Sequence, residues 1–256
     1  MMKMSSTLWK NDTFINDNIN YLFNKEITEY DMSEAGFSLI REFKLLDDKT
    51  IKKLSTYSKD KRKIEIGKIQ RDNDTFKKMI KESFPLSRRF FFEYNSLEDD
   101  DIISIKKDAI ITTKHCSHTK IGNYINFRPK HFYTSYIHLN KRLELYYSPE
   151  DFAVKGISDN LLKEHEDYMI KFIKLFFKKM ETEDNSTVIE FTRHFIDKYK
   201  NRELDIGYYR NFDNSSKFIT YDKDIVYTEC WDEFKDEIDI SYNFYNILLK
   251  IIKIPL

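Results

Sequence analysis

The sequence predicts an α+β fold, in which an antiparallel sheet with flanking helices precedes a smaller, mainly helical C-terminal region. Two observations support this prediction. Short runs rich in β-branched and aromatic residues recur between residues 27 and 157. Beyond residue 158 the apolar residues recur at helical spacing instead, which places the boundary between a body (1–158) and a C-terminal region (159–256) near Ser158.

The first strong element is the segment 27–32, which alternates like a strand. The following segment, 33–43, has the pattern of a helix with Ser33 as its N-cap. Asp31 therefore lies where a strand ends and a helix begins, so its backbone is fixed while its side chain faces open space. Residues 48–85 form a basic stretch, with two short helices expected over 48–83.

The rest of the body is predicted to be mostly strands. Arg88–Asn95 has the composition of a strand and precedes an acidic turn at Glu98–Asp101. A β-rich run at 102–113 contains Lys106, Lys107 and Asp108. Further strands are expected at 124–127, 132–139, 143–147 and 152–157, and two helices at about 161–180 and 187–200.

The charge of the chain is balanced overall but uneven locally. Lys and Arg total 43 and Asp and Glu total 43, which argues against a protein that simply coats nucleic acid. From Arg41 to Arg89, however, the chain contains sixteen basic and eight acidic residues, an excess of eight basic residues. A locally basic segment of this kind can hold phosphates. The many Lys, Ile, Asn, Tyr and Phe residues are typical of an AT-rich genome, which we favour over a base-stacking role for the aromatics.

The cysteines and the ends of the chain predict a cytoplasmic protein. Two cysteines are too few for a disulfide framework and suit a reducing compartment. The N-terminus has no apolar signal core, and no apolar run reaches the length of a membrane span. His115, Cys116 and His118 are close in sequence, but structural zinc sites usually draw four ligands from two separated pairs. We therefore expect ordinary loop residues there.

Three segments follow one another in the order of catalytic motifs in family B DNA polymerases, which the chain resembles. Asp31–Ile40 is similar to the motif D-x-x-S-L-Y-P-S. The segment 61–71 resembles the basic fingers helix that contacts the incoming triphosphate. The segment 104–110 occupies the place of Y-G-D-T-D-S, with Asp108 at the second Asp.

Two later segments extend the resemblance to roughly residues 27–215. Lys141 and Arg142, followed by Lys155 and Gly156, are similar to the basic strand and Lys-Gly pair that the family uses near the primer. The segment 195–205 resembles a thumb helix and the connection after it. The resemblance implies a minimal antiparallel palm with a fingers-like insertion and a thumb-like C-terminal region, without an exonuclease domain.

The resemblance also implies a function: a template-dependent nucleotidyltransferase of phage or mobile-element type, either a small DNA or RNA polymerase or a polymerase subunit. Its substrates would be a primer–template and nucleoside triphosphates, and its cofactor Mg²⁺ or Mn²⁺ in two-metal chemistry. Asp31 and Asp108 would be the catalytic, metal-binding carboxylates. Phosphate contacts would come from two further sets: nucleotide-binding Arg62, Lys63, Lys68 and Arg71, and nucleic-acid-binding Lys141, Arg142 and Lys155.

The residues taken singly allow simpler interpretations. Asp31 suits a carboxylate that complements a helix N-terminus, and Asp108 suits a hairpin turn. The basic residues suit solvated surface positions. Only the ordered combination of the motifs favours the catalytic interpretation.

The sequence departs from the family at two informative positions. Lys106 stands where the first Asp of Y-G-D-T-D-S is expected, which keeps open a catalytically inactive, palm-derived protein that binds nucleic acid or a partner protein. Gly36 aligns with the bulky aromatic residue that excludes the ribose 2′-hydroxyl. Glycine leaves that space free, so the alignment predicts loose sugar selectivity or an RNA-making activity.

Overall fold

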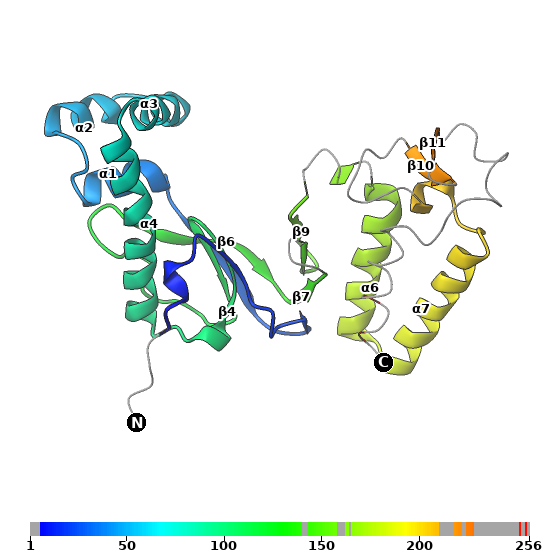
Figure 1. The fold of residues 1–256 in the computed structure, drawn as a ribbon. Helices are drawn as coiled ribbons and strands as arrows, with labels where there is room; N and C mark the ends of the chain where they lie inside the picture. The colour runs from blue at the N-terminus through cyan, green and yellow to red at the C-terminus, as the bar shows by residue number, and fades with distance from the viewer. Residues whose placement is uncertain are drawn as a thin grey trace. The chain divides into compact units, whose positions relative to one another are not determined.

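The computed structural model describes residues 6–139, 143–157, 162–163, 165–209, 218–221, 224–227, 251 and 254 (Figure 1). The chain forms two compact units. Unit 1 comprises residues 1–18 and 26–132, and unit 2 comprises residues 19–25 and 133–256. Each unit contains a sheet with helices, so the predicted α+β class is confirmed.

Unit 1 is built on a five-stranded sheet with the strand order β1-β4-β5-β3-β6. Its strands are β1 (Thr13–Ile15), β3 (Ile27–Met32), β4 (Ile102–Lys106), β5 (Ala109–Thr112) and β6 (Phe127–Tyr133). The strand predicted at 27–32 and the β-rich run at 102–113 are confirmed, and the latter forms an antiparallel β4–β5 hairpin. Because β5 also pairs antiparallel with β3, the turn of this hairpin lies beside the C-terminal end of β3.

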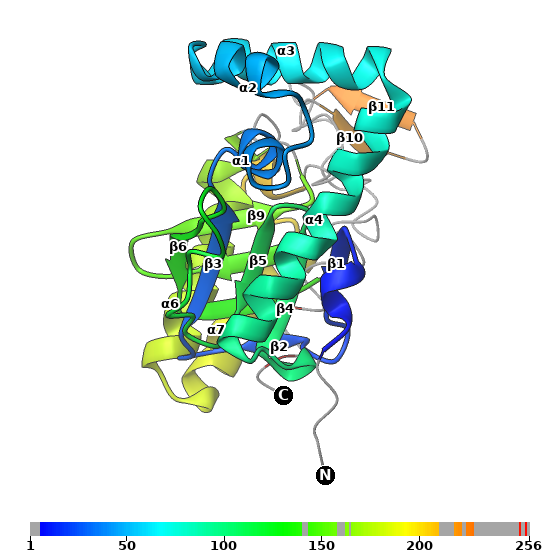
Figure 2. The same cartoon turned by 90° about the vertical axis from the view of Figure 1, so that its left-hand side faces the viewer.

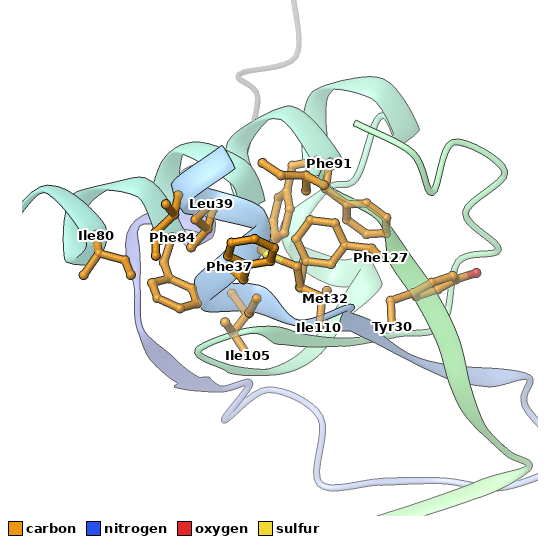
Figure 3. Packing of buried hydrophobic residues seen from close by; sticks show 14 of the residues in the cluster. Tyr30, Met32, Phe37, Leu39, Ile80, Phe84, Phe91, Ile105, Ile110 and Phe127 are labelled. Atoms are coloured by element: carbon orange, nitrogen blue, oxygen red, sulfur yellow. The ribbon is translucent and has the colours of Figure 1, made fainter. Parts of the chain in front are cut away.

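Helices cover one face of this sheet and extend beyond its end (Figures 1 and 2). They are η1 (Leu8–Lys10), α1 (Ala35–Glu42), α2 (Asp48–Ser55), α3 (Lys59–Asp72), α4 (Asp74–Asn95) and η2 (Asp99–Asp101). Figure 3 shows α1 and α4 packing apolar side chains onto the strands, with Phe37 and Phe91 directed toward Met32, Ile110 and Phe127. This core holds the start of α1 and the end of β3 in fixed positions.

Three local predictions in unit 1 are wrong. Arg88–Asn95 is the last part of α4 rather than a strand, because its buried side chains recur every three or four residues despite their β propensity. The stretch 48–83 contains α2, α3 and the first part of α4 instead of two short helices. The N-cap of α1 is Glu34, in a left-handed conformation, instead of Ser33.

The described part of unit 2 contains a four-stranded antiparallel sheet, the helices α6 and α7, and the two-stranded sheet β10-β11. The sheet has the order β2-β7-β8-β9, formed by β2 (Tyr21–Leu22), β7 (Ser135–His138), β8 (Glu144–Tyr147) and β9 (Phe152–Lys155). The segment η3 (Glu166–Ile170) leads into α6 (Lys171–Thr182). After α6 come α7 (Asn185–Lys200), η4 (Ile206–Tyr209), β10 (Phe218–Tyr221) and β11 (Asp224–Tyr227).

The sheet of unit 2 shares one apolar core with the helices that follow it. Leu145 and Tyr147 on β8 belong to the same cluster as Phe172 and Phe177 on α6. For this reason the compact units divide after Phe132, whereas the sequence placed a boundary near residue 158. Among the described residues, no helix is both long enough and apolar enough to cross a membrane.

Candidate functional site

Asp31 and Asp108 come together at one end of the sheet in unit 1. The register of β3 against β5 places Asp31 opposite Ala109, the residue that follows Asp108. The backbone N–H of Met32 donates a hydrogen bond to the carbonyl of Asp108, with an N···O distance of 2.9 Å. Two residues that are far apart in sequence are therefore neighbours in the sheet, and the charge of Asp108 raises the pKa of Asp31.

The surroundings of Asp31 make its ionised form costly. Burial raises the pKa of Asp31 above its usual range, and the neighbouring charges of Asp108 and Glu29 raise it further. Lys130 on β6 opposes this rise, because its Nζ lies 3.7 Å from Asp31 Oδ2. A second cation close to both carboxylates would favour ionisation in the same way.

The donor set at this site suits a hard divalent cation. In the described part of the chain, no group of three or more His, Cys, Asp and Glu side chains is arranged to hold a metal ion. Mg²⁺ needs no such group, since one or two carboxylates, waters and substrate phosphates complete its shell. Asp31 and Asp108 are carboxylates, the ligand type that Mg²⁺ prefers.

The segment containing His115, Cys116 and His118 packs beside Tyr30 of β3, and its cysteine is buried. The backbone N–H of Cys116 donates to the hydroxyl of Tyr30 at 2.8 Å, and its side chain is buried. Burial raises the pKa of the Cys116 thiol to about 12. This environment favours a structural thiol over a thiolate ligand.

The turn that carries Asp108 is fixed by a buried arginine. Lys107 has a left-handed backbone with φ of 55°, and its carbonyl accepts a hydrogen bond from Arg88 Nη1 at 2.5 Å. Arg88 is fully buried, and it also donates to the carbonyl of Trp9 at 2.9 Å and to Asp12 Oδ1 at 3.0 Å. The N–H of Lys107 in turn donates to the carbonyl of Asp12 at 2.7 Å. Sequence reasoning missed Arg88 because it assigned the residue to a strand.

A pocket of about 300 Å³ adjoins Asp108. It lies among α1, α3, α4 and the β4–β5 turn, and its lining residues are Glu34, Ala35, Gly36, Phe37, Lys59, Arg62, Lys63, Ile66, Gly67, Gln70, Ile80, Phe84, Lys107 and Asp108. Four of these residues are basic and two are acidic. The pocket therefore combines an apolar wall with a net positive charge, which suits an anionic ligand that also has an apolar part.

The nucleotide-binding residues predicted on α3 divide into two groups. Arg62 and Lys63 line the pocket, as does Gly36 on α1. Lys68 and Arg71 lie outside the pocket lining, where Lys68 Nζ is 2.8 Å from Glu65 and Arg71 Nε is 3.3 Å from Asp72.

One helical face of α3 lines the pocket. Lys59, Lys63, Gly67 and Gln70 all line the pocket. Their separations of three and four residues place them on one helical face, and that periodicity was the available signal.

Arg62 is largely committed to contacts within the protein. Its Nε donates to the carbonyl of Leu54 at 3.0 Å, and its Nη2 donates to the carbonyl of Tyr57 at 2.8 Å. Its Nη1 lies 2.7 Å from Glu34 Oε2, and its guanidinium stacks over the ring of Phe37. Arg62 therefore joins α1, α2 and α3, while Lys59 and Lys63 are better candidates for phosphate contacts.

The nucleic-acid-binding residues predicted in the C-terminal half belong to unit 2. Lys155 ends β9, where it is paired in register with Glu144 of β8. Lys141 and Arg142 lie outside the described residues. Their contact with a primer–template stays a prediction.

Comparison with known proteins identifies a phage family. The family model described as bacteriophage PBS1 gene 130 protein matches residues 4–256. The chain belongs to this family. The match runs through both compact units. No curated protein matches the chain significantly. The description of the family names a phage gene rather than an activity.

Proposed function

We propose that the chain is a template-dependent nucleotidyltransferase of a phage, which joins nucleotides to a nucleic-acid primer. The main support is the register that makes Asp31 a neighbour of Asp108, together with the pocket that Asp108 lines with four basic residues. In this proposal the two carboxylates are the metal ligands, and the basic residues of the pocket are the phosphate contacts. The order of elements, with a strand and helix before basic helices and a hairpin, is the order that the resemblance to family B DNA polymerases implies.

Each part of the site has a role in this proposal. Asp31 and Asp108 would hold Mg²⁺ or Mn²⁺, which would supply activation of the attacking hydroxyl and neutralisation of charge on the leaving phosphate. Lys59, Lys63 and Lys107 contact the phosphates of the incoming nucleotide. Lys130 offsets part of the rise in the pKa of Asp31 and so favours its carboxylate form.

The position of Gly36 supports a broad sugar specificity. Gly36 lines the pocket, and a Cβ atom added there would have no neighbour within 4 Å. Space is therefore left beside the α1 backbone, where the resemblance expects a bulky aromatic side chain. We infer that the site accepts ribonucleotides as well as deoxyribonucleotides.

Primer extension tests the proposal directly. The wild-type chain is assayed with labelled dNTPs or NTPs and either Mg²⁺ or Mn²⁺, beside Asp31→Asn and Asp108→Asn. We expect extension by the wild type and a loss of at least 100-fold in both variants. Asp17→Asn changes an exposed carboxylate outside the site and serves as the matched control. Wild type that extends no primer with either metal would refute the enzyme proposal, and full activity of Asp31→Asn would refute the site assignment.

One specific observation favours a second candidate. Lys130 already contacts Asp31, and Lys106 stands where the resemblance expects another carboxylate. Both features suit a palm-derived protein that has lost catalysis and binds nucleic acid or a partner protein. This candidate predicts that the wild type, Asp31→Asn and Asp108→Asn all bind nucleic acid equally well. It also predicts that none of the three extends a primer.

A further inference from the structure

Two glycines that line the pocket beside Asp108 have no evident structural reason to be glycine. The chain contains five glycines in 256 residues, and Gly36 and Gly67 both line this pocket. Gly67 lies in the interior of α3, and Gly36 lies in the first turn of α1. A helix interior disfavours glycine relative to alanine, because glycine loses more backbone freedom on folding.

Backbone conformation and packing explain other glycines but not these two. Gly156 has a φ of 102°, which side chains rarely adopt. At Gly122 an added Cβ would overlap the carboxylate of Glu42, and at Gly207 it would overlap the ring of Tyr168. At Gly36 and Gly67, by contrast, an added Cβ would find nothing within 4 Å and the φ angles are ordinary. What these two positions share is the pocket in front of them.

The walls around Gly67 indicate what enters this space. Figure 3 shows Ile80 and Phe84 on α4 close to Phe37 on α1, and all three line the pocket. All three side chains are nearly buried, so they give a flat group a narrow apolar wall to pack against. Lys63 and Gln70 lie one helical turn to either side of Gly67, and so offer a cation and an amide to the same ligand. A ring system with hydrogen-bonding edges and an attached phosphate chain matches this combination.

We propose that the backbone of α3 at Gly67 contacts the nucleoside part of a bound nucleoside triphosphate, and that Gly67 is glycine to permit this approach. Lys59, Lys63 and Lys107 then face the phosphates. The inference rests on the proposed function for the ligand class. It adds a residue that determines affinity and that the comparison with polymerase motifs did not single out.

Gly67→Ala and Gly67→Leu test the inference through two readouts that should move in opposite directions. Binding of ATP, GTP, CTP and UTP is measured by calorimetry in Ca²⁺ without primer, and Tm is measured on the same samples. We expect Tm of Gly67→Ala to equal or exceed that of the wild type, while nucleotide affinity falls several-fold. In Gly67→Leu the affinity falls at least tenfold. Ile64→Ala, at an exposed position of the same helix, should bind like the wild type.

The outcomes separate this inference from the proposed function. Wild-type affinity in Gly67→Leu overturns the inference, as does a drop in Tm that parallels the loss of binding, or a wild type that binds none of the four nucleotides. If Gly67→Leu binds like the wild type and both extend primers, the inference falls and the enzyme proposal stands. If the wild type binds nucleotides, Gly67→Leu does not, and neither extends a primer, the inference stands and the enzyme proposal falls.

Discussion

Arg88→Met should lower the free energy of unfolding by about 2–4 kcal/mol. The substitution keeps a long side chain in a fully buried position but removes every donor. The carbonyls of Trp9 and Lys107 then lose a buried partner, and each unsatisfied carbonyl costs about 1–3 kcal/mol. The ion pair with Asp12 adds little, because the Asp12 side chain is 47% exposed. The removal of a buried charge offsets part of the sum.

Urea unfolding followed by circular dichroism measures this effect. The matched control is Arg89→Met, the next residue of α4, whose side chain is 49% exposed and pairs with Glu93 on the same helix. Its expected cost is about 0.5 kcal/mol or less. Arg88→Lys should lie between the two, since it keeps the charge but not the planar fork of donors. A cost below about 1 kcal/mol for Arg88→Met, or equal to that of Arg89→Met, would refute the reasoning.

Three other predictions concern single side chains. Because the pKa of Asp31 is raised above its ordinary value of 3.8, folding favours the protonated form, and its contribution to stability declines as pH rises through that value to the folded pKa. Asp31→Asn should therefore raise stability at pH 7, and the gain should vanish below about pH 3 in pH-dependent urea titrations; a variant less stable than the wild type at pH 7 would contradict this. Burial raises the pKa of the Cys116 thiol to about 12, so in a Cys230→Ser variant Cys116 should resist a thiol reagent at pH 8 and react fully in urea. Rapid labelling of the folded chain would show that Cys116 is not buried. Gly36→Tyr should reduce the use of NTPs relative to dNTPs in primer extension at least tenfold, unless Gly36 lies away from the sugar, in which case the ratio stays constant.

The sequence predicted the parts of the site that depend on local pattern. The alternating segment before Asp31 and the run around Asp108 are recognisable as strands, and their pairing follows once they share a sheet. Arg88 was missed because three consecutive phenylalanines suggested a strand, although their burial in the folded chain follows a helix. Lys68 and Arg71 were predicted as nucleotide contacts and Lys59 was not, because the sequence does not reveal which face of α3 packs beside α1 and α4. That choice depends on tertiary contacts.

The path of the chain through its two units has a consequence for its synthesis. Residues 19–25 belong to unit 2, although the segments before and after them belong to unit 1. Strand β2 is synthesised early, but it cannot pair in its sheet until β7 (Ser135–His138) has been synthesised. A translation product that stops at Phe132 would contain all of unit 1 together with β2 of unit 2, without the strand that β2 pairs with. Neither unit can therefore be produced cleanly by shortening the gene from one end.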